Sequence, residues 1–204
     1  EPSQEALDYA KEKGFEWEMT PIGIDALVFI TGKDNPTVGL TREQIPAIYN
    51  GELTNWSQVG GPDKAIVPYL RNADSGSHTL FDLFFDLKNN DAIAKEYMVG
   101  SMIGLLEAIA TYRGEDEALG YTVYYYLTNM EASTLETSKL LAVDGVMPSN
   151  DTIASGEYPL SNPFYAVIPA NTPKDSKTRL LYDWICSDQG RVIAENENYV
   201  VPQK

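Results

Sequence analysis

The chain has few of the residues that disulfides, metal sites and histidine-based catalysis require. Its 204 residues include one cysteine, Cys186, and one histidine, His78. A single cysteine excludes an intrachain disulfide and a cysteine metal cluster, and a single histidine excludes a multi-histidine metal site. His78 also follows Ser77 directly, which is a poor geometry for a base that must activate that hydroxyl. We therefore expect no metal, no cofactor and no serine-hydrolase triad.

Long apolar runs and an excess of basic residues are lacking as well. No stretch of about 18 apolar residues occurs, so the sequence contains no candidate transmembrane helix. The formal net charge is -15, whereas a nucleic-acid-binding protein would carry a basic patch. Because of this negative charge, we expect no nucleic-acid partner. The chain opens on the polar segment EPSQEALDYAKEKG rather than on a signal peptide, as a trimmed precursor would also do.

Helical and strand patterns alternate along the chain, which indicates an α/β protein. Apolar positions at helical spacing predict helices at 4–14, 41–51, 77–87, 91–98, 101–112 and 174–195. Apolar and β-branched runs predict strands at 15–33, 118–127, 139–147 and 164–170. In the last helix we expect Cys186 to be a buried thiol and six apolar residues to face the core: Leu180, Leu181, Trp184, Ile185, Val192 and Ile193.

The segment AIVPYLRNADSGSHTLFDLFFDL combines the elements of an anion site. An apolar run delivers Arg71 into a small polar loop, and an amphipathic helix follows, whose first-turn N–H groups and dipole favour negative charge. Arg71, Ser75 and Ser77 would add side-chain donors, and Gly76 would allow a ligand close to the backbone. The same residues also fit a plainer interpretation, in which a serine caps the helix and Arg71 is a solvated or salt-bridged surface residue.

Six segments together carry a family resemblance: TPIGIDALVFITGKDNP, LTREQIPAIYNGELTNWSQVGG, R-N-A-D-S-G-S, ALGYTVYYYL, GEYPLSNPFYAVI and YDWICSDQGRVIAENENYVVPQ. They cover nearly the whole chain, and they resemble the phosphate-binding proteins of bacterial phosphate ABC transporters, which are PstS-like periplasmic binding proteins of type 2. The R-x-x-x-S-G-[ST] element is the most specific of them for ligand. The phrase IYNGELTNW is the most specific for the family.

The resemblance implies an α/β fold of two three-layer lobes with mixed sheets. Residues 1–33 and 162–204 would belong to lobe one, and residues 34–161 would form lobe two with the anion loop. In the family, the other half of the phosphate site comes from a Gly/Thr/Ser-rich N-terminal loop, a later serine and an aspartate. The resemblance places these segments upstream of the position of Glu1, where the given sequence starts. We therefore expect an incomplete first lobe and weak phosphate binding by this chain alone.

The resemblance also implies which residues contact phosphate. These are Arg71 through its guanidinium, Ser75 through hydroxyl and amide, Gly76 through its amide, and Ser77 through hydroxyl and amide. The family's usual threonine is a serine at position 77, which keeps the hydroxyl. Asp74 is an accessory candidate, and we favour a salt bridge with Arg71 over a ligand contact.

The function that the resemblance implies is non-catalytic binding of inorganic phosphate for an ABC importer. The partner would be the membrane permease, and the protein would be an extracytoplasmic monomer, periplasmic or at the cell surface, with a lipid anchor on its full-length precursor. One alternative is a similar lobe used as a sensor or cell-surface module for another oxyanion. Another is a hydrolase with Ser75 or Ser77 as nucleophile, although the sequence has no G-x-S-x-G elbow or P-loop.

Overall fold

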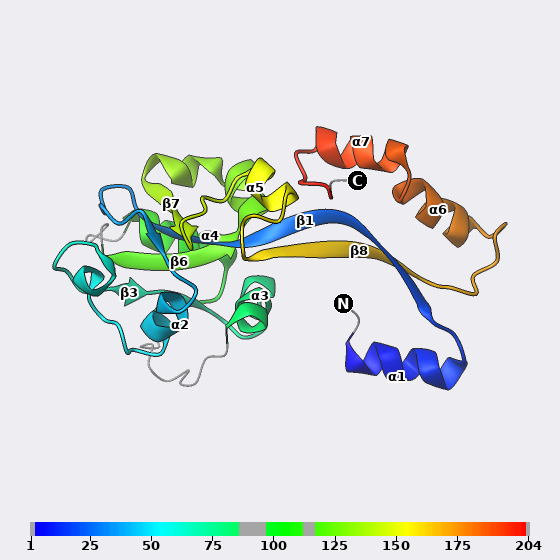
Figure 1. Ribbon diagram of the computed structural model, residues 1–204, viewed down its shortest axis with the longest axis horizontal. Helices are drawn as coiled ribbons and strands as arrows, with labels where there is room; N and C mark the ends of the chain where they lie inside the picture. Colours follow the sequence, from blue (N-terminus) through cyan, green and yellow to red (C-terminus); the bar gives the residue numbers. More distant parts are fainter. Residues whose placement is uncertain (1–2, 86–96, 112–116, 203–204) are drawn as a thin grey trace. The chain divides into compact units, whose positions relative to one another are not determined.

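The computed structural model describes residues 3–85, 97–111 and 117–202, and it divides the chain into two compact units (Figure 1). The terminal unit comprises Glu1–Asp25 and Asn162–Lys204, and the central unit comprises Ala26–Ser161. The first division therefore falls inside a strand, after Asp25. The second division falls between residues 161 and 162.

A mixed sheet forms the centre of the central unit. Its strand order is β2-β7-β1-β6-β3, in which β1 is antiparallel to both β6 and β7, while β2 and β3 are parallel to their neighbours. The run from Ala26 to Ile30 is buried throughout, as expected for a strand covered on both faces. The strand bounds are Trp17–Gly32 for β1, Gly39–Leu40 for β2, Val67–Pro68 for β3, Ala118–Val123 for β6 and Ser138–Val143 for β7.

Side-chain hydrogen bonds mark several helix starts in the central unit, with Ser75 as the N-cap of α3 and Ser149 as that of α5. The T-x-x-Q pattern of Thr41–Gln44 is typical of a capping box, and the reciprocal bonds are present: the Thr41 amide donates to the Gln44 side chain and the Gln44 amide donates to the Thr41 hydroxyl, at 2.9 and 3.2 Å. A second, two-stranded sheet pairs β4 with β5 in parallel. The bounds are Gln44–Tyr49 for α2, Gly76–Phe84 for α3, Met102–Thr111 for α4, Asn150–Ala154 for α5, Leu70–Arg71 for β4 and Met98–Val99 for β5, with short 3-10 or π helices at Trp56–Val59, Tyr126–Met130 and Ala132–Glu136.

A cluster of aromatic rings packs α3 against the sheet. The ring of Phe81, on α3, lies 4.8 Å from that of Tyr121 on β6 and 4.8 Å from that of Tyr49 on α2, measured between centroids. Phe29 on β1 and Phe85 extend the cluster, and all five side chains are buried. Such aromatic pairs add stabilisation beyond the apolar area they remove from water. The cluster therefore fixes the position of α3, and with it the position of the helix N-terminus.

In the part of the terminal unit that the structure describes, helices α1, α6 and α7 accompany β8 and the first part of β1. The predicted first helix is confirmed as α1, Gln4–Lys13, with Ser3 as its N-cap and Gly14 in the left-handed conformation, at φ 71°, as its end. β8, Ser161–Pro169, pairs with β1. The chain then forms α6, Lys177–Ile185, and α7, Asp188–Asn196.

The prediction of one closing helix over residues 174–195 is wrong. The helix ends at Ile185, and Ser187 begins a new one, because its hydroxyl accepts a hydrogen bond from the Gly190 amide. A Cβ on Gly190 would lie 2.2 Å from the carbonyl oxygen of Ile185, so the sharp junction requires glycine there. Cys186, at this junction, is partly exposed, so the prediction of a buried thiol is also wrong.

The predicted burial of the apolar side chains on this helical segment is mostly wrong. Helical spacing does put apolar residues on one face of each helix, but the described part of the chain leaves this face largely uncovered. Five of the six side chains are exposed, by 44% for Trp184 and by up to 58% for the others: Leu180, Leu181, Trp184, Val192 and Ile193.

Two other sequence predictions had a limited outcome. The strand predicted at 118–127 ends at Val123, and a π helix occupies Tyr126–Met130, so the last residues of the predicted strand are helical instead. Most of the helix predicted at 91–98 lies outside the described residues. Of the helices that the structure describes, none is long and apolar enough to cross a membrane.

We predict that Phe81→Ala lowers the free energy of unfolding of the central unit by about 3 to 5 kcal/mol, because it removes a fully buried ring from the cluster. The matched control is Leu83→Ala on the same helix, where the side chain is 65% exposed and the change should stay within about 0.5 kcal/mol. Urea denaturation followed by circular dichroism measures both. Equal losses in the two variants would contradict the assigned core.

Candidate anion-binding site

The structure brings the four predicted phosphate contacts together at the start of α3. Arg71 is the last residue of β4, a short loop follows, and Ser75 is the N-cap of α3. The Ser75 hydroxyl accepts a hydrogen bond from the His78 amide at 3.2 Å. The N–H groups of Gly76 and Ser77 belong to the first helical turn, which has no intrahelical acceptor for them.

Arg71 is a buried cation with an unused donor. Its side chain and backbone are only 5% exposed, and its Nε donates to the carbonyl of Val99 on β5 at 3.2 Å. The Nη1 group is buried and has no hydrogen-bond partner among the described residues. Burial lowers the pKa of the Arg71 guanidinium, and the hydroxyls of Tyr121 and Tyr126 oppose that effect. The group still stays charged near neutral pH, because the ordinary pKa of an arginine lies far above neutral.

The two serines of the loop have different roles. Ser77 is fully buried, and its hydroxyl has no hydrogen-bond partner in the described part of the chain. Ser75 is engaged instead, because its hydroxyl caps the helix and its amide donates to the carbonyl of Asn72 at 3.0 Å. The amide that the resemblance assigned to phosphate at position 75 therefore already has an acceptor.

Gly76 and Asp74 face outward from the loop. A Cβ added to Gly76 would meet no atom within 4 Å, so the backbone there is open to a ligand. Asp74 is exposed, and the ion pairs found among the described residues do not join it to Arg71, so the preferred salt bridge is not formed.

The ring nitrogens of His78 have partners other than the two serine hydroxyls. Its Nδ1 lies 3.1 Å from the hydroxyl oxygen of Tyr121, and its Nε2 lies 3.5 Å from a carboxylate oxygen of Asp82. The same Tyr121 oxygen accepts a hydrogen bond from the Arg71 amide at 3.1 Å. Nothing in the local sequence pattern indicates the contact of this tyrosine with the loop.

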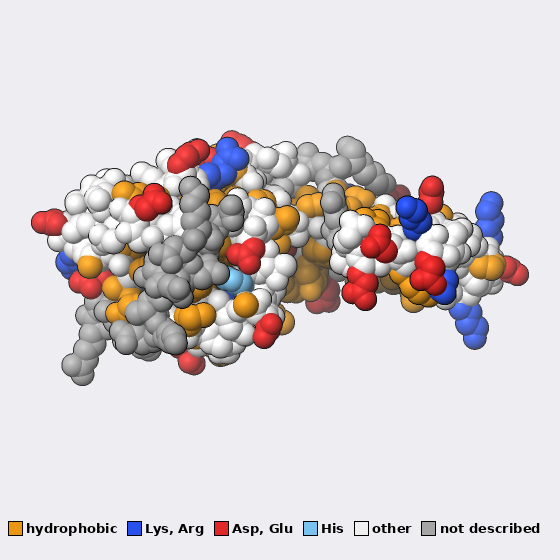
Figure 2. All heavy atoms as spheres, turned by 90° about the horizontal axis from the view of Figure 1, so that it is seen from below, with side chains coloured by type: hydrophobic (Ala, Val, Ile, Leu, Met, Phe, Trp, Pro, Cys, Tyr) orange, Lys and Arg blue, Asp and Glu red, His pale blue; other side chains and the backbone are white. Residues whose placement is uncertain are grey.

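Acidic side chains on the surface do not preclude an anion site here. Figure 2 shows them scattered over one face of the molecule, separated by apolar and uncharged side chains. Exposed charges are screened over about 8 Å at physiological ionic strength, whereas buried donors act at contact distance. Within the described residues, no cluster of histidine, cysteine and carboxylate side chains could hold a metal ion.

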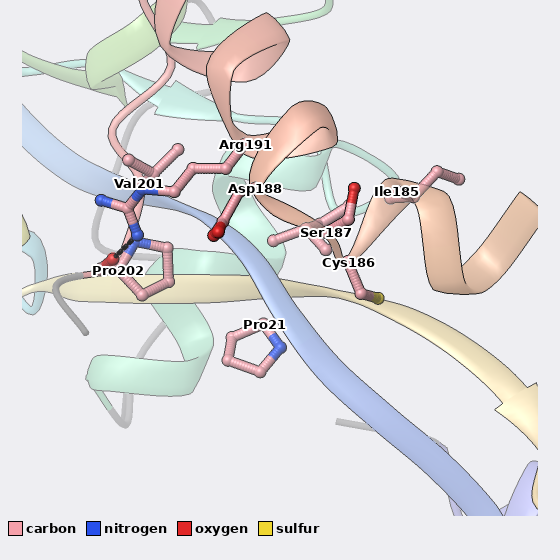
Figure 3. Close-up of a pocket in the computed structure, with 9 residues that line it drawn as sticks. Pro21, Ile185, Cys186, Ser187, Asp188, Arg191, Val201 and Pro202 are labelled. Atoms are coloured by element: carbon pink, nitrogen blue, oxygen red, sulfur yellow. Dashed lines mark hydrogen bonds between the residues drawn. The ribbon is translucent and has the colours of Figure 1, made fainter.

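A cavity in the terminal unit is less suited to an anion than the loop at Arg71. Pro21, Cys186, Ser187, Asp188 and Arg191 are among the residues that line it (Figure 3). Arg191 donates through Nη1 to the carbonyl of Pro202 and through Nε to Glu195 at 2.9 Å, so two of its three side-chain nitrogens already have partners. Asp188 adds negative charge at the start of α7. The loop at Arg71 is therefore the better candidate.

Comparisons with known proteins agree with the resemblance found in the sequence. A family model described as PBP superfamily domain matches residues 3–189. The phosphate-binding protein PstS of Borreliella burgdorferi is 27% identical over 186 residues, which are 89% of this chain and 64% of the relative. The PstS protein of Staphylococcus haemolyticus is 27% identical over 203 residues, which are 95% of this chain and 61% of the relative. The chain thus spans less than two thirds of the length of these relatives.

Solved structures share the fold. An ABC-type phosphate transport receptor from Vibrio cholerae has a TM-score of 0.76 at 24% identity, over 91% of this chain and 73% of that one. A putative phosphate ABC transporter substrate-binding protein from Clostridium perfringens, with bound phosphate, has a TM-score of 0.70 at 25% identity, over 100% of this chain and 76% of that one. By its family match and its mixed α/β fold, the chain belongs to the PBP superfamily, as its sequence predicted.

Proposed function

We propose that the chain binds inorganic phosphate as part of an extracytoplasmic solute-binding protein of an ABC importer. The observation that carries the proposal is the pair of buried donors without partners among the described residues, Arg71 Nη1 and Ser77 Oγ, in an R-x-x-x-S-G-S element that opens α3. The names of the relatives, phosphate-binding protein PstS, support the same ligand. The partner would be the membrane permease, and the protein would act as a monomer.

The donors suit a tetrahedral oxyanion because such a ligand is all acceptor. The Arg71 guanidinium supplies charge, and hydrogen bonds to a charged group are roughly twice as strong as neutral ones. The Ser77 hydroxyl and the Gly76 and Ser77 amides add donors in the field of the helix N-terminus. A buried donor without an acceptor costs about 1 to 3 kcal/mol. An anion in the loop would remove that cost for both side chains.

The geometry of His78 supports a binding role rather than a catalytic one. A serine nucleophile needs a base within hydrogen-bond reach of its hydroxyl. The two ring nitrogens of His78 are instead directed to Tyr121 and Asp82. We therefore propose that the protein binds and releases its ligand without chemical change.

We predict that Arg71→Ala weakens phosphate binding by at least about tenfold, because it removes the charged donor of the site. The measurement is a titration of the chain with phosphate at constant ionic strength, followed by the NMR shifts of the loop amides, which remains informative when affinity is low. Phosphate should move the Gly76 and Ser77 amides of the wild-type chain.

The matched control for this variant is Arg42→Ala, which changes the net charge equally. Arg42 lies in the same unit, is exposed and pairs with Asp144. Its loss should leave the titration nearly unchanged, because exposed charge is screened. Equal effects of the two variants would reject the loop as the site. A parallel titration with sulfate tests the alternative of a module for another oxyanion.

We predict that Gly76→Ala weakens phosphate binding without destabilising the fold. The added methyl group would meet no protein atom within 4 Å, and a helical alanine in place of glycine stabilises by about 0.4 to 1 kcal/mol. The methyl group would instead crowd an oxyanion that approaches the amide. The same titration and a melting curve check both parts. Unchanged affinity would mean that the ligand does not approach Gly76 closely.

A further inference from the structure

Three elements of the central unit meet through one hydroxyl group. Tyr121 lies on β6, Arg71 ends β4, and His78 lies in the first turns of α3. The Tyr121 hydroxyl accepts from the Arg71 amide at 3.1 Å and lies 3.1 Å from His78 Nδ1. All three residues are buried. The contacts therefore join the strand that carries the cation to the helix that carries the amide donors.

Donors and acceptors can be assigned along these three contacts. The Tyr121 oxygen accepts from the Arg71 amide, and we assign its own proton to His78 Nδ1, the ring nitrogen that lies within hydrogen-bond distance of it. With Nδ1 as acceptor, the ring proton of neutral His78 is on Nε2, which faces Asp82 at 3.5 Å. Burial raises the pKa of the Tyr121 hydroxyl well above its ordinary value, so the hydroxyl keeps its proton.

The aromatic cluster holds the Tyr121 hydroxyl in place. The ring contacts Phe81 at 4.8 Å and Tyr49 at 5.8 Å between centroids, so the position of the oxygen is set by packing on two sides. His78 is held twice, because its amide donates to the Ser75 hydroxyl and its ring binds Tyr121. By contrast, β4 is a short strand, in which Leu70 and Arg71 pair with Met98 and Val99 of β5. The Tyr121 contact adds a hydrogen bond that fixes the backbone at Arg71.

We propose that Tyr121 and His78 are positioning residues of the phosphate site. The chain Arg71 N–H, Tyr121 O–H, His78 Nδ1 sets the distance between the Arg71 guanidinium and the first-turn amides of α3, without either residue touching the ligand. This inference rests on the proposed function. To the phosphate site it adds Tyr121 and His78, two residues outside the R-x-x-x-S-G-S element that tune the affinity for phosphate.

Tyr121→Phe tests the proposal, because it keeps the ring and removes only the hydroxyl. In the ligand-free protein, hydrogen exchange of the Arg71 amide should become about tenfold faster, as the loss of one hydrogen bond allows. Phosphate affinity in the NMR titration should fall by about five- to tenfold. The matched control is Tyr158→Phe, which removes another buried tyrosine hydroxyl of the central unit, one that donates to the carbonyl of Leu27 on β1 at 2.9 Å. This control should change neither quantity.

Two variants of His78 separate positioning from packing. His78→Asn keeps an acceptor near the place of Nδ1, whereas His78→Leu fills the space without one. The proposal expects the asparagine variant to bind phosphate more tightly than the leucine variant. A packing role alone would give the reverse order, since leucine buries more apolar area. The reverse order would overturn the role of His78.

The outcomes distinguish this inference from the proposed function. If wild-type protein binds phosphate and Tyr121→Phe binds it equally well, the positioning role is overturned and the phosphate site stands. If phosphate moves no loop amide in the wild-type chain, the proposed function is overturned, and with it the role of these residues in affinity. Unchanged exchange of the Arg71 amide in Tyr121→Phe would overturn the hydrogen-bonded chain itself, whatever the ligand.

Discussion

The packing of Phe81 against Tyr121 is the contact on which the candidate site depends. It joins a helix to a strand forty residues further along the chain, and both rings are fully buried. A helix N-terminus binds an anion well only when its amides are held in place beforehand, because any ordering at the moment of binding would be subtracted from affinity. The ring contact does this ordering during folding. It also places the Tyr121 hydroxyl where Arg71 and His78 can share it.

The aromatic core of the central unit offsets the free-energy cost of burying donors without acceptors in the loop. Two buried donors, Arg71 Nη1 and Ser77 Oγ, have no partner among the described residues, which goes against the general rule that buried polar groups are paired. Functional sites are where such exceptions collect, since a donor already satisfied by the protein has little to offer a ligand. The aromatic cluster and the buried run Ala26–Ile30 of β1 belong to the same unit as the loop and offset the cost.

The sequence alone predicted much of the fold and of the loop, because both depend on local pattern. The α/β class, the buried strand before Gly32, the capping box at Thr41 and the clustering of Arg71 with Ser77 follow from spacing and composition. The exposure of Trp184 and its neighbours did not, because helical spacing tells which residues share a face and not what covers it. The contact of Tyr121 with Arg71 depends on how β6 lies relative to β4, which no short segment encodes.

The two serines of the S-G-S element illustrate how one short loop serves both folding and binding. Ser75 is used by the fold, since its hydroxyl caps α3 and its amide closes the turn onto Asn72. Ser77 follows two residues after this N-cap, and it is buried with no partner for its hydroxyl among the described residues. Gly76 lies between them with open space beside its backbone. If both serines capped the helix, the loop would offer fewer donors, and if neither did, the helix would begin less rigidly. The division of roles between Ser75 and Ser77 therefore fixes the start of α3 and leaves the Ser77 hydroxyl available to a ligand.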